Sequence, residues 1–236
     1  MKKLLFCSII LFLTNCSTDD FSEKYVLLHE TPPEGLKIRL VEGDEVTRYF
    51  YHANGFVDSI AKVGKDVITT EKFIYNDQNQ IIKQKTYKKK TTETLFSIYT
   101  TSFFTYNYKN QIASTKTYND NNILKEKSVH NYNEDGTLYN PTHIVKDGNL
   151  IQQNAKGLSN TFTFDTHRNP FFNIYPKAYR ILKYINKNNI TLQVTQATNY
   201  TNGYAYTLRY NEQGYIIQKL NPYNPNNSYL SNYYYD

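Results

Sequence analysis

The segment Phe73-Ile74-Tyr75-Asn76-Asp77-Gln78-Asn79-Gln80-Ile81 decides the fold of this chain. Phe73 and Tyr75 are two residues apart, so their side chains lie on one face of a strand. Asn76 follows, and its short side chain can accept hydrogen bonds from the backbone of a turn. Asn79 tolerates a positive φ angle, and Ile81 then begins a new extended segment. The segment therefore predicts a β-hairpin with a short turn.

The same pattern recurs along the chain, as expected for an internal repeat. The other copies are 49–57, 104–112, 130–138, 162–170 and 208–216, and 118–123 is a shorter seventh candidate. In five of the six copies, Gly or Asn stands four residues after the key aromatic residue, and an aliphatic residue follows two positions later. The copy at 162–170 departs from this rule, because Asn169 comes one position late and Pro170 replaces the aliphatic residue.

Successive hairpins predict an all-β fold, an antiparallel meander within one domain of residues 25–236. The composition agrees, since 24 Tyr and 13 Phe favour strands whose rings are buried on one face. A sheet of this length twists and must cover its apolar face, so we expect one curled sheet or an incomplete barrel, with a folded-over sandwich as the alternative. The many Lys and Gln residues argue against a membrane-spanning barrel.

The repeat resembles the YD repeat of RHS proteins and teneurins, whose core is an aromatic residue, Asn or Asp, a Gly turn and an aliphatic residue. It is most similar to the degenerate YD-like repeats of uncharacterised bacterial lipoproteins. The resemblance covers about residues 45–220 and implies the hairpin architecture. The copies are irregularly spaced, and the Gly-Arg-Leu-type run that ends the true YD motif is missing. Because the shells built by RHS proteins are also much longer, the resemblance does not imply an encapsulating function.

Two segments interrupt the repeat. Asn169-Pro170-Phe171-Phe172 predicts a turn fixed by Pro170 that places Phe171 or Phe172 in the core, with a binding loop that displays an aromatic ring as the alternative. Residues 176–184 predict a short helix with Pro176 at its first position. Its apolar residues would cover an open end of the sheet.

The N-terminal residues indicate where the protein is located. Met1-Lys2-Lys3 precedes an apolar run of about ten residues that ends before Cys16, which is too short for a membrane span of about 20 residues but suits a signal peptide. It resembles a bacterial lipoprotein signal, cut before a cysteine that then carries lipid such as palmitate. We therefore expect a signal peptide at 1–15, and lipidated Cys16 with a flexible tether at 16–24. The alternative is an ordinary secretory signal, since Asn15 stands where Gly, Ala or Ser is usual. Loss of Cys7 with the signal would leave Cys16 without a disulfide partner, which favours lipidation.

The predicted location is the outer membrane, reached through the N-terminal lipid. The acidic tether around Asp19 and Asp20 resembles a surface-export signal and favours the cell surface over the periplasmic face. The net charge of +6 is no indication of a nucleic-acid partner. The lysine cluster at 83–90 is interpreted as a solvated strand end, with contact to anionic lipid headgroups or acidic glycans as the alternative.

The sequence offers no recognisable catalytic chemistry. None of the five histidines stands at a metal-ligand spacing, and no nucleophile elbow or phosphate loop occurs. Asp77, Asp120, Asp135 and Asp165 fall in turns, where carboxylates cap the backbone. We therefore predict no catalytic residue, no cofactor and no metal site, and expect that the protein is not an enzyme.

The leading hypothesis is a binding or scaffold protein of the envelope, with a glycan or another envelope protein as its partner. The candidate ligand-binding residues are Tyr229, Tyr233, Tyr234 and Tyr235, because exposed tyrosines suit sugar stacking and protein contacts. Their alternative interpretation is a last core strand at 229–235. Two alternative functions remain, a purely structural envelope component and an unrecognised hydrolase with a pair of carboxylates.

Overall fold

A computed structural model describes residues 36–221 and 229–236. The predicted signal peptide, Cys16 and the tether lie outside the described residues. The described part of the chain contains β-strands and one short helix, α1 (Lys177–Leu182). Every strand pairs antiparallel with its neighbours, which confirms the predicted all-β meander.

The strands divide into two sheets. The larger has eleven strands in the order β14-β15-β16-β1-β2-β3-β4-β5-β6-β7-β8. In chain order its members are β1 (Ile38–Glu42), β2 (Val46–Tyr51), β3 (Val57–Val63), β4 (Val67–Tyr75), β5 (Ile81–Lys90), β6 (Ser97–Tyr106), β7 (Ile112–Asn119), β8 (Leu124–Val129), β14 (Thr207–Tyr210), β15 (Ile216–Asn221) and β16 (Tyr229–Tyr235). The smaller has the order β13-β12-β11-β10-β9. Its members are β9 (His143–Lys146), β10 (Asn149–Ala155), β11 (Leu158–Arg168), β12 (Asn188–Gln196) and β13 (Thr201–Ala205).

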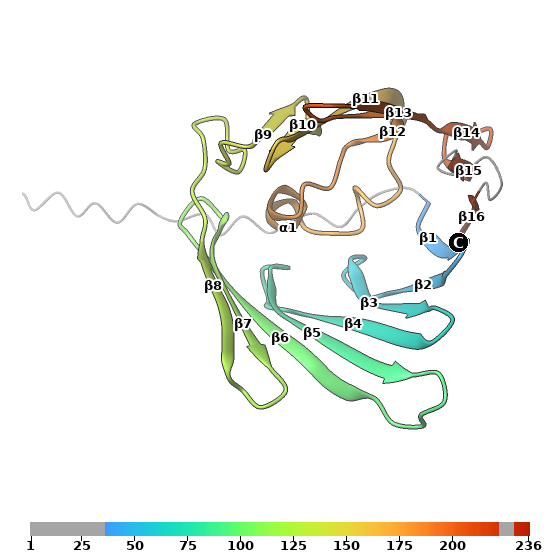
Figure 1. Cartoon of the computed structure of the whole chain (residues 1–236). Coiled ribbons are helices and arrows are strands. Elements are labelled where there is room, and N and C mark those ends of the chain that lie inside the picture. The colour runs from blue at the N-terminus through green and yellow to red at the C-terminus, as the bar shows by residue number, and fades with distance from the viewer. Residues whose placement is uncertain (1–35, 222–228) are drawn as a thin grey trace, which may run out of the picture.

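Together the sheets curl around α1 without closing into a barrel (Figure 1). On one side the chain passes from β13 into β14 through Tyr206, so one extended segment contributes to both sheets. On the other side β8 and β9 end their sheets, and residues 130–142 connect them. We call this side the seam.

The turns form as the repeat predicts. Gly55, Asn79, Asn110, Gly136 and Gly214 all adopt a positive φ between 58° and 83°. Asparagine side chains close these turns. Asn76 Oδ1 accepts the backbone N–H groups of residues 78 and 80 at 3.1 and 3.0 Å, and the asparagines at 107, 119 and 211 repeat the arrangement. The repeated asparagines therefore close the turns of the hairpins.

The key tyrosines form a hydrogen-bonded ladder across the large sheet. Tyr75 pairs in register with Ile81 of its own repeat, and its hydroxyl donates to the carbonyl of Val57 in the preceding repeat at 2.6 Å. The tyrosine ladder consists of Tyr51, Tyr75, Tyr106, Tyr132 and Tyr235, which donate to the carbonyls of Ile38, Val57, Ile81, Ile112 and Ile216 at 2.6–2.9 Å. All five acceptor residues are at most 2% exposed. The hydroxyls thus satisfy buried carbonyls while the rings fill the core.

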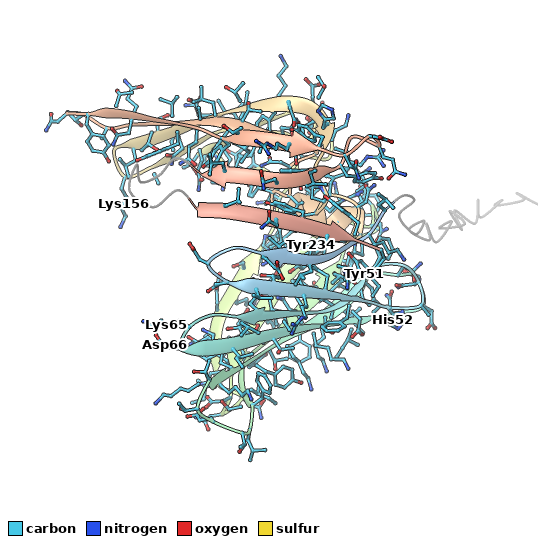
Figure 2. All side chains as sticks on the ribbon, turned by 90° about the vertical axis from the view of Figure 1, so that its right-hand side faces the viewer. Tyr51, His52, Lys65, Asp66, Lys156 and Tyr234 are labelled. Atoms are coloured by element: carbon cyan, nitrogen blue, oxygen red, sulfur yellow. The ribbon has the colours of Figure 1, made fainter. Side chains whose placement is uncertain are left out.

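The two ends of the described chain complete one repeat between them. Ile38 of β1 pairs with Tyr235 of β16, and the Asp236 N–H donates to the carbonyl of Lys37 at 3.0 Å. Tyr235 supplies the tyrosine of this repeat and Ile38 supplies the aliphatic residue. The ladder therefore continues through the junction of the termini, on the side that faces the viewer in Figure 2.

The core lies beneath α1. Tyr179 of the helix is 4% exposed and meets the rings of Phe73 and Phe104 edge-on, at centroid distances of 5.7 and 5.8 Å. Phe171 packs against the core beside Tyr49, as predicted for this turn. The helix begins at Lys177 rather than at Pro176, which is its N-cap.

The copy at 162–170 forms no hairpin, because β11 runs through it to Arg168. Asp165 instead joins the two sheets: its carboxylate accepts hydrogen bonds from the Tyr210 hydroxyl and from the backbone and side-chain N–H groups of Asn189. The seventh candidate does form a turn, with φ of 58° at Asn122.

Candidate functional site

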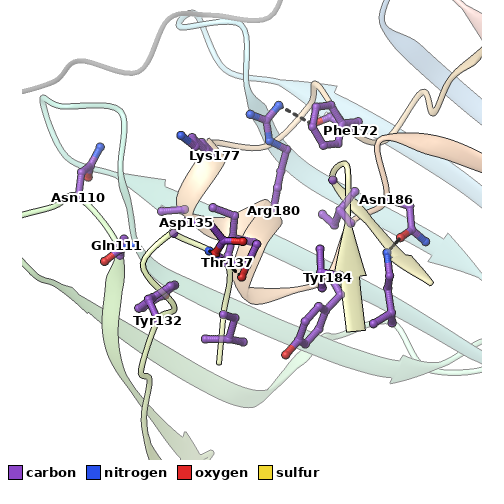
Figure 3. Close-up of a pocket in the computed structure, with 18 of the residues that line it drawn as sticks. Asn110, Gln111, Tyr132, Asp135, Thr137, Phe172, Lys177, Arg180, Tyr184 and Asn186 are labelled. Carbon is purple, nitrogen blue, oxygen red and sulfur yellow. Dashed lines mark hydrogen bonds between the residues drawn. The ribbon is translucent and has the colours of Figure 1, made fainter. Parts of the chain in front are cut away.

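A cavity of about 620 Å³ lies at the seam between the two sheets. Four segments and Phe172 surround it. The segments are the β6–β7 turn at 109–111, the hairpin at 132–138, the β9–β10 region at 145–150, and α1 with the residues that follow it. Figure 3 shows their side chains around a common hollow. The cavity lies where β8 and β9, the last strands of their sheets, do not pair with each other, and α1 forms part of its lining.

The end of α1 shapes one wall through an unusual backbone conformation. The Ile185 N–H donates to the Arg180 carbonyl at 3.0 Å and the Tyr184 N–H donates to the Ile181 carbonyl at 3.2 Å, which is a Schellman motif. Tyr184 occupies its left-handed position with φ of 49°, where Gly is usual. The ring of His143 stacks on Tyr184 at a centroid distance of 4.6 Å. A strained tyrosine is thus held against the cavity.

Aliphatic side chains form part of the cavity lining. Leu138 comes from the hairpin, Val145 from β9 and Leu150 from β10, while Ile181 and Ile185 come from α1 and its C-terminal turn. Leu138 is the aliphatic residue of the fourth repeat, and its only β-partner among the described residues is Tyr132. The repeat therefore contributes to the cavity where its ladder ends.

Charged groups around the cavity are mostly positive. Lys109, Lys177 and Arg180 line it, and Asp135 is the single carboxylate among the described lining residues. The Thr137 hydroxyl and N–H donate to Asp135 at 2.6 and 2.9 Å, which lowers the pKa of that carboxyl, so Asp135 is ionised at neutral pH. Three cations against one carboxylate favour a ligand with negative charge.

Arg180 and Tyr132 of the cavity lining also make hydrogen bonds within the protein. The Arg180 guanidinium lies 4.2 Å from the ring centroid of Phe172 and donates to the Phe172 carbonyl at 2.9 Å. Burial raises the pKa of Tyr132 to about 12, so its hydroxyl stays protonated and donates to the Ile112 carbonyl. These bonds fix the two side chains in place before any ligand arrives.

The predicted ligand-binding tyrosines lie away from this cavity, on β16. Tyr233 and Tyr235 pack against the core, whereas Tyr234 is 39% exposed and donates to Glu42 at 2.9 Å. The side chain of Tyr229 lies outside the described residues. The strand itself matches the alternative interpretation of 229–235 as a last core strand, and ligand binding by these tyrosines stays a prediction.

Sequence reasoning missed the cavity residues. The helix at 176–184 was the one signal that pointed to the open end of the sheet. Within the described residues, no group of three or more His, Cys, Asp or Glu is arranged to hold a metal ion. No helix in the described ranges is long and apolar enough to span a membrane.

No protein-family model matches the sequence, and no curated protein matches it. A porin-like protein from Bacteroides uniformis is similar in structure, with a TM-score of 0.43 and 12% identity over 87% of this chain and 99% of that chain. A porin-like protein from Bacteroides vulgatus has a TM-score of 0.34 and 8% identity over 85% of this chain and 99% of that chain.

Proposed function

We propose that this chain is a lipid-anchored binding protein of the outer membrane that holds a small amphipathic anion in the seam cavity. The observation that carries the proposal is the cavity itself, whose volume of about 620 Å³ falls within the range of about 300–1,000 Å³ typical of small-molecule sites. The N-terminal sequence ending in Cys16 supports the anchor, and the acidic tether supports the cell surface over the periplasmic face.

The lining supports the ligand class. An apolar body would pack against Leu138, Val145 and Ile181, while an anionic end would lie near Lys177 and Arg180. An acidic sugar derivative with an apolar substituent fits this description, as does a small aromatic acid. The fixed positions of Arg180 and Tyr132 reduce the cost of ordering the site on binding.

The test is fluorescence titration of the full chain with 8-anilinonaphthalene-1-sulfonate, which has an aromatic body and one sulfonate. We expect saturable binding that Lys177→Gln weakens about five- to tenfold, because the variant removes a charge at the cavity. Lys183→Gln is the matched control, since Lys183 is exposed on the following turn and does not line the cavity. Equal affinity in wild type and Lys177→Gln would reject the cavity as an anion site.

A second candidate function is a purely structural envelope component. The tyrosine ladder favours it, because the repeated tyrosines are used for internal hydrogen bonds. This function predicts no saturable probe binding at the cavity, so the same titration distinguishes the two.

A further inference from the structure

The positive charge of the chain is concentrated on five neighbouring strands. Strands β4 to β8 contain nine lysines and two glutamates, a net charge of +7, whereas the whole chain has a net charge of +6. The rest of the chain is therefore almost neutral. Such an asymmetry gives the protein one strongly basic side.

Strand register places five of these lysines on the outer face. Phe73 and Phe104 are buried, so the residues that alternate with them point away from the core. The basic face is defined by the outward positions on β4, β5, β7 and β8 that this alternation selects: Lys72, Lys83, Lys85, Lys116 and Lys127. Phe103, 39% exposed, lies between Lys83 and Lys116 in the same row.

No acidic side chain balances this face among the described residues of these strands. Glu71 bonds to Gln84, which in turn accepts from the core residue Tyr179, so Glu71 lies on the inner face. Glu126 pairs with Thr117, whose hydroxyl meets Ser102 on that same inner side. None of the five lysines makes an ion pair with a described residue.

The arrangement works against the stability of the sheet. Lys72 is directly opposite Lys85, and Lys116 is directly opposite Lys127. Like charges in directly opposed positions destabilise a sheet. An anionic partner would remove this repulsion, whereas solvent only screens it.

Apolar side chains border the basic face at one end of the strands. The β3–β4 turn at Lys65 and Asp66 lies at the end opposite His52 (Figure 2), and the Thr91 N–H donates to the Asp66 carbonyl, which places the β5–β6 turn at that same end. Leu95 on the β5–β6 turn is 81% exposed, and Ile123 on the β7–β8 turn is 61% exposed. Figure 1 shows these turns projecting away from α1. Exposed apolar residues beside lysines are typical of an interfacial membrane contact.

We propose that the basic face docks on a membrane surface rich in anionic phospholipid headgroups, with the tips at Leu95 and Ile123 entering the interface. The five lysines lie on four strands, which together with β6 span about 20 Å at the usual strand spacing. Such a two-dimensional array matches a layer of phosphate groups better than a single polymer chain. The proposal concerns the opposite surface of the sheet from the cavity and does not depend on the cavity's ligand.

The test is co-sedimentation of the full unlipidated chain with two kinds of vesicle, phosphatidylcholine alone or mixed in equal parts with phosphatidylglycerol. Any binding by the apolar N-terminal segment is common to all variants, so the preference for the anionic vesicle is the quantity compared. We expect a preference that falls about a hundredfold in the triple variant Lys83→Gln, Lys116→Gln and Lys127→Gln, at about a factor of five per lysine.

The matched control is Lys146→Gln, Lys156→Gln and Lys187→Gln, three exposed lysines outside β4 to β8. Thermal melting checks that both triple variants fold, and removing the Lys116–Lys127 repulsion favours folding of the first. Equal losses in both triple variants, or no preference in the wild type, would overturn the proposal. Retention on polygalacturonate without a vesicle preference would also overturn it and would assign the face to an acidic polysaccharide.

Discussion

Removing one hydroxyl from the tyrosine ladder tests the physical basis of the fold. Tyr75→Phe deletes the donor to the Val57 carbonyl, a bond of 2.6 Å to a residue that is fully buried. The ring itself stays packed beside Phe56, whose centroid lies 6.2 Å away. A buried hydrogen bond contributes about 0.5–1.5 kcal/mol, and a carbonyl that loses its partner costs more. We therefore expect the free energy of unfolding to fall by about 1–2 kcal/mol.

The assay is urea denaturation, with melting temperature as a second measure. A loss of this size moves the melting temperature of a chain of this length down by about 3–6 °C, with the urea m-value unchanged. Tyr108→Phe is the control, because Tyr108 is 76% exposed. Adding Tyr235→Phe should produce an additive loss, since the two tyrosines are not adjacent in the ladder. If Tyr75→Phe and Tyr108→Phe are equally stable, the ladder does not stabilise the fold as we argue.

Three further predictions follow from the same features. Burial raises the pKa of Tyr51, Tyr75 and Tyr235 well above the usual range and that of Tyr132 to about 12. Since the unfolded chain loses these protons near pH 10, the contribution of these tyrosines to stability is fully present below about pH 10 and falls toward pH 12. An unchanged urea midpoint between about pH 10 and pH 12 would contradict this. Asn122 has φ of 58°, so Asn122→Ala should lower the free energy of unfolding by about 1 kcal/mol, whereas Asn122→Gly should not. Urea denaturation of the two variants measures the difference, and equal losses would show that the left-handed backbone is not the cause. Cys16→Ala should abolish metabolic labelling by palmitate, and persistent labelling would place the lipid elsewhere.

The local part of the fold is readable in the sequence because its determinants are close together. A turn depends on residues within one hairpin, and the pattern from Tyr75 to Ile81 correctly placed the left-handed position at Asn79. The same reasoning correctly predicted the left-handed positions of Gly136 and Gly214. Backbone sterics favour Gly or Asn at left-handed positions, so the residue types within one hairpin are enough to predict them.

The remaining features depend on contacts between distant segments. Tyr235 belongs to the ladder, but its partner Ile38 lies at the other end of the described chain, so no single segment contains both residues of this pair. Asp165 was interpreted as a turn cap. It does accept the backbone N–H of His167, but both residues lie in β11, and its carboxylate also joins the sheets through Tyr210. The seam cavity is lined by α1 together with residues 109–111, 132–138 and 145–150, and no local pattern predicts that these distant segments meet.

The most direct test of the proposed function is a crystal structure of the protein with 8-anilinonaphthalene-1-sulfonate bound. We predict electron density for the probe in the seam cavity, with its rings against Leu138 and Ile181 and its sulfonate toward Lys177 and Arg180. Density for the probe only on the basic face of β4 to β8, with the cavity unchanged, would contradict the account.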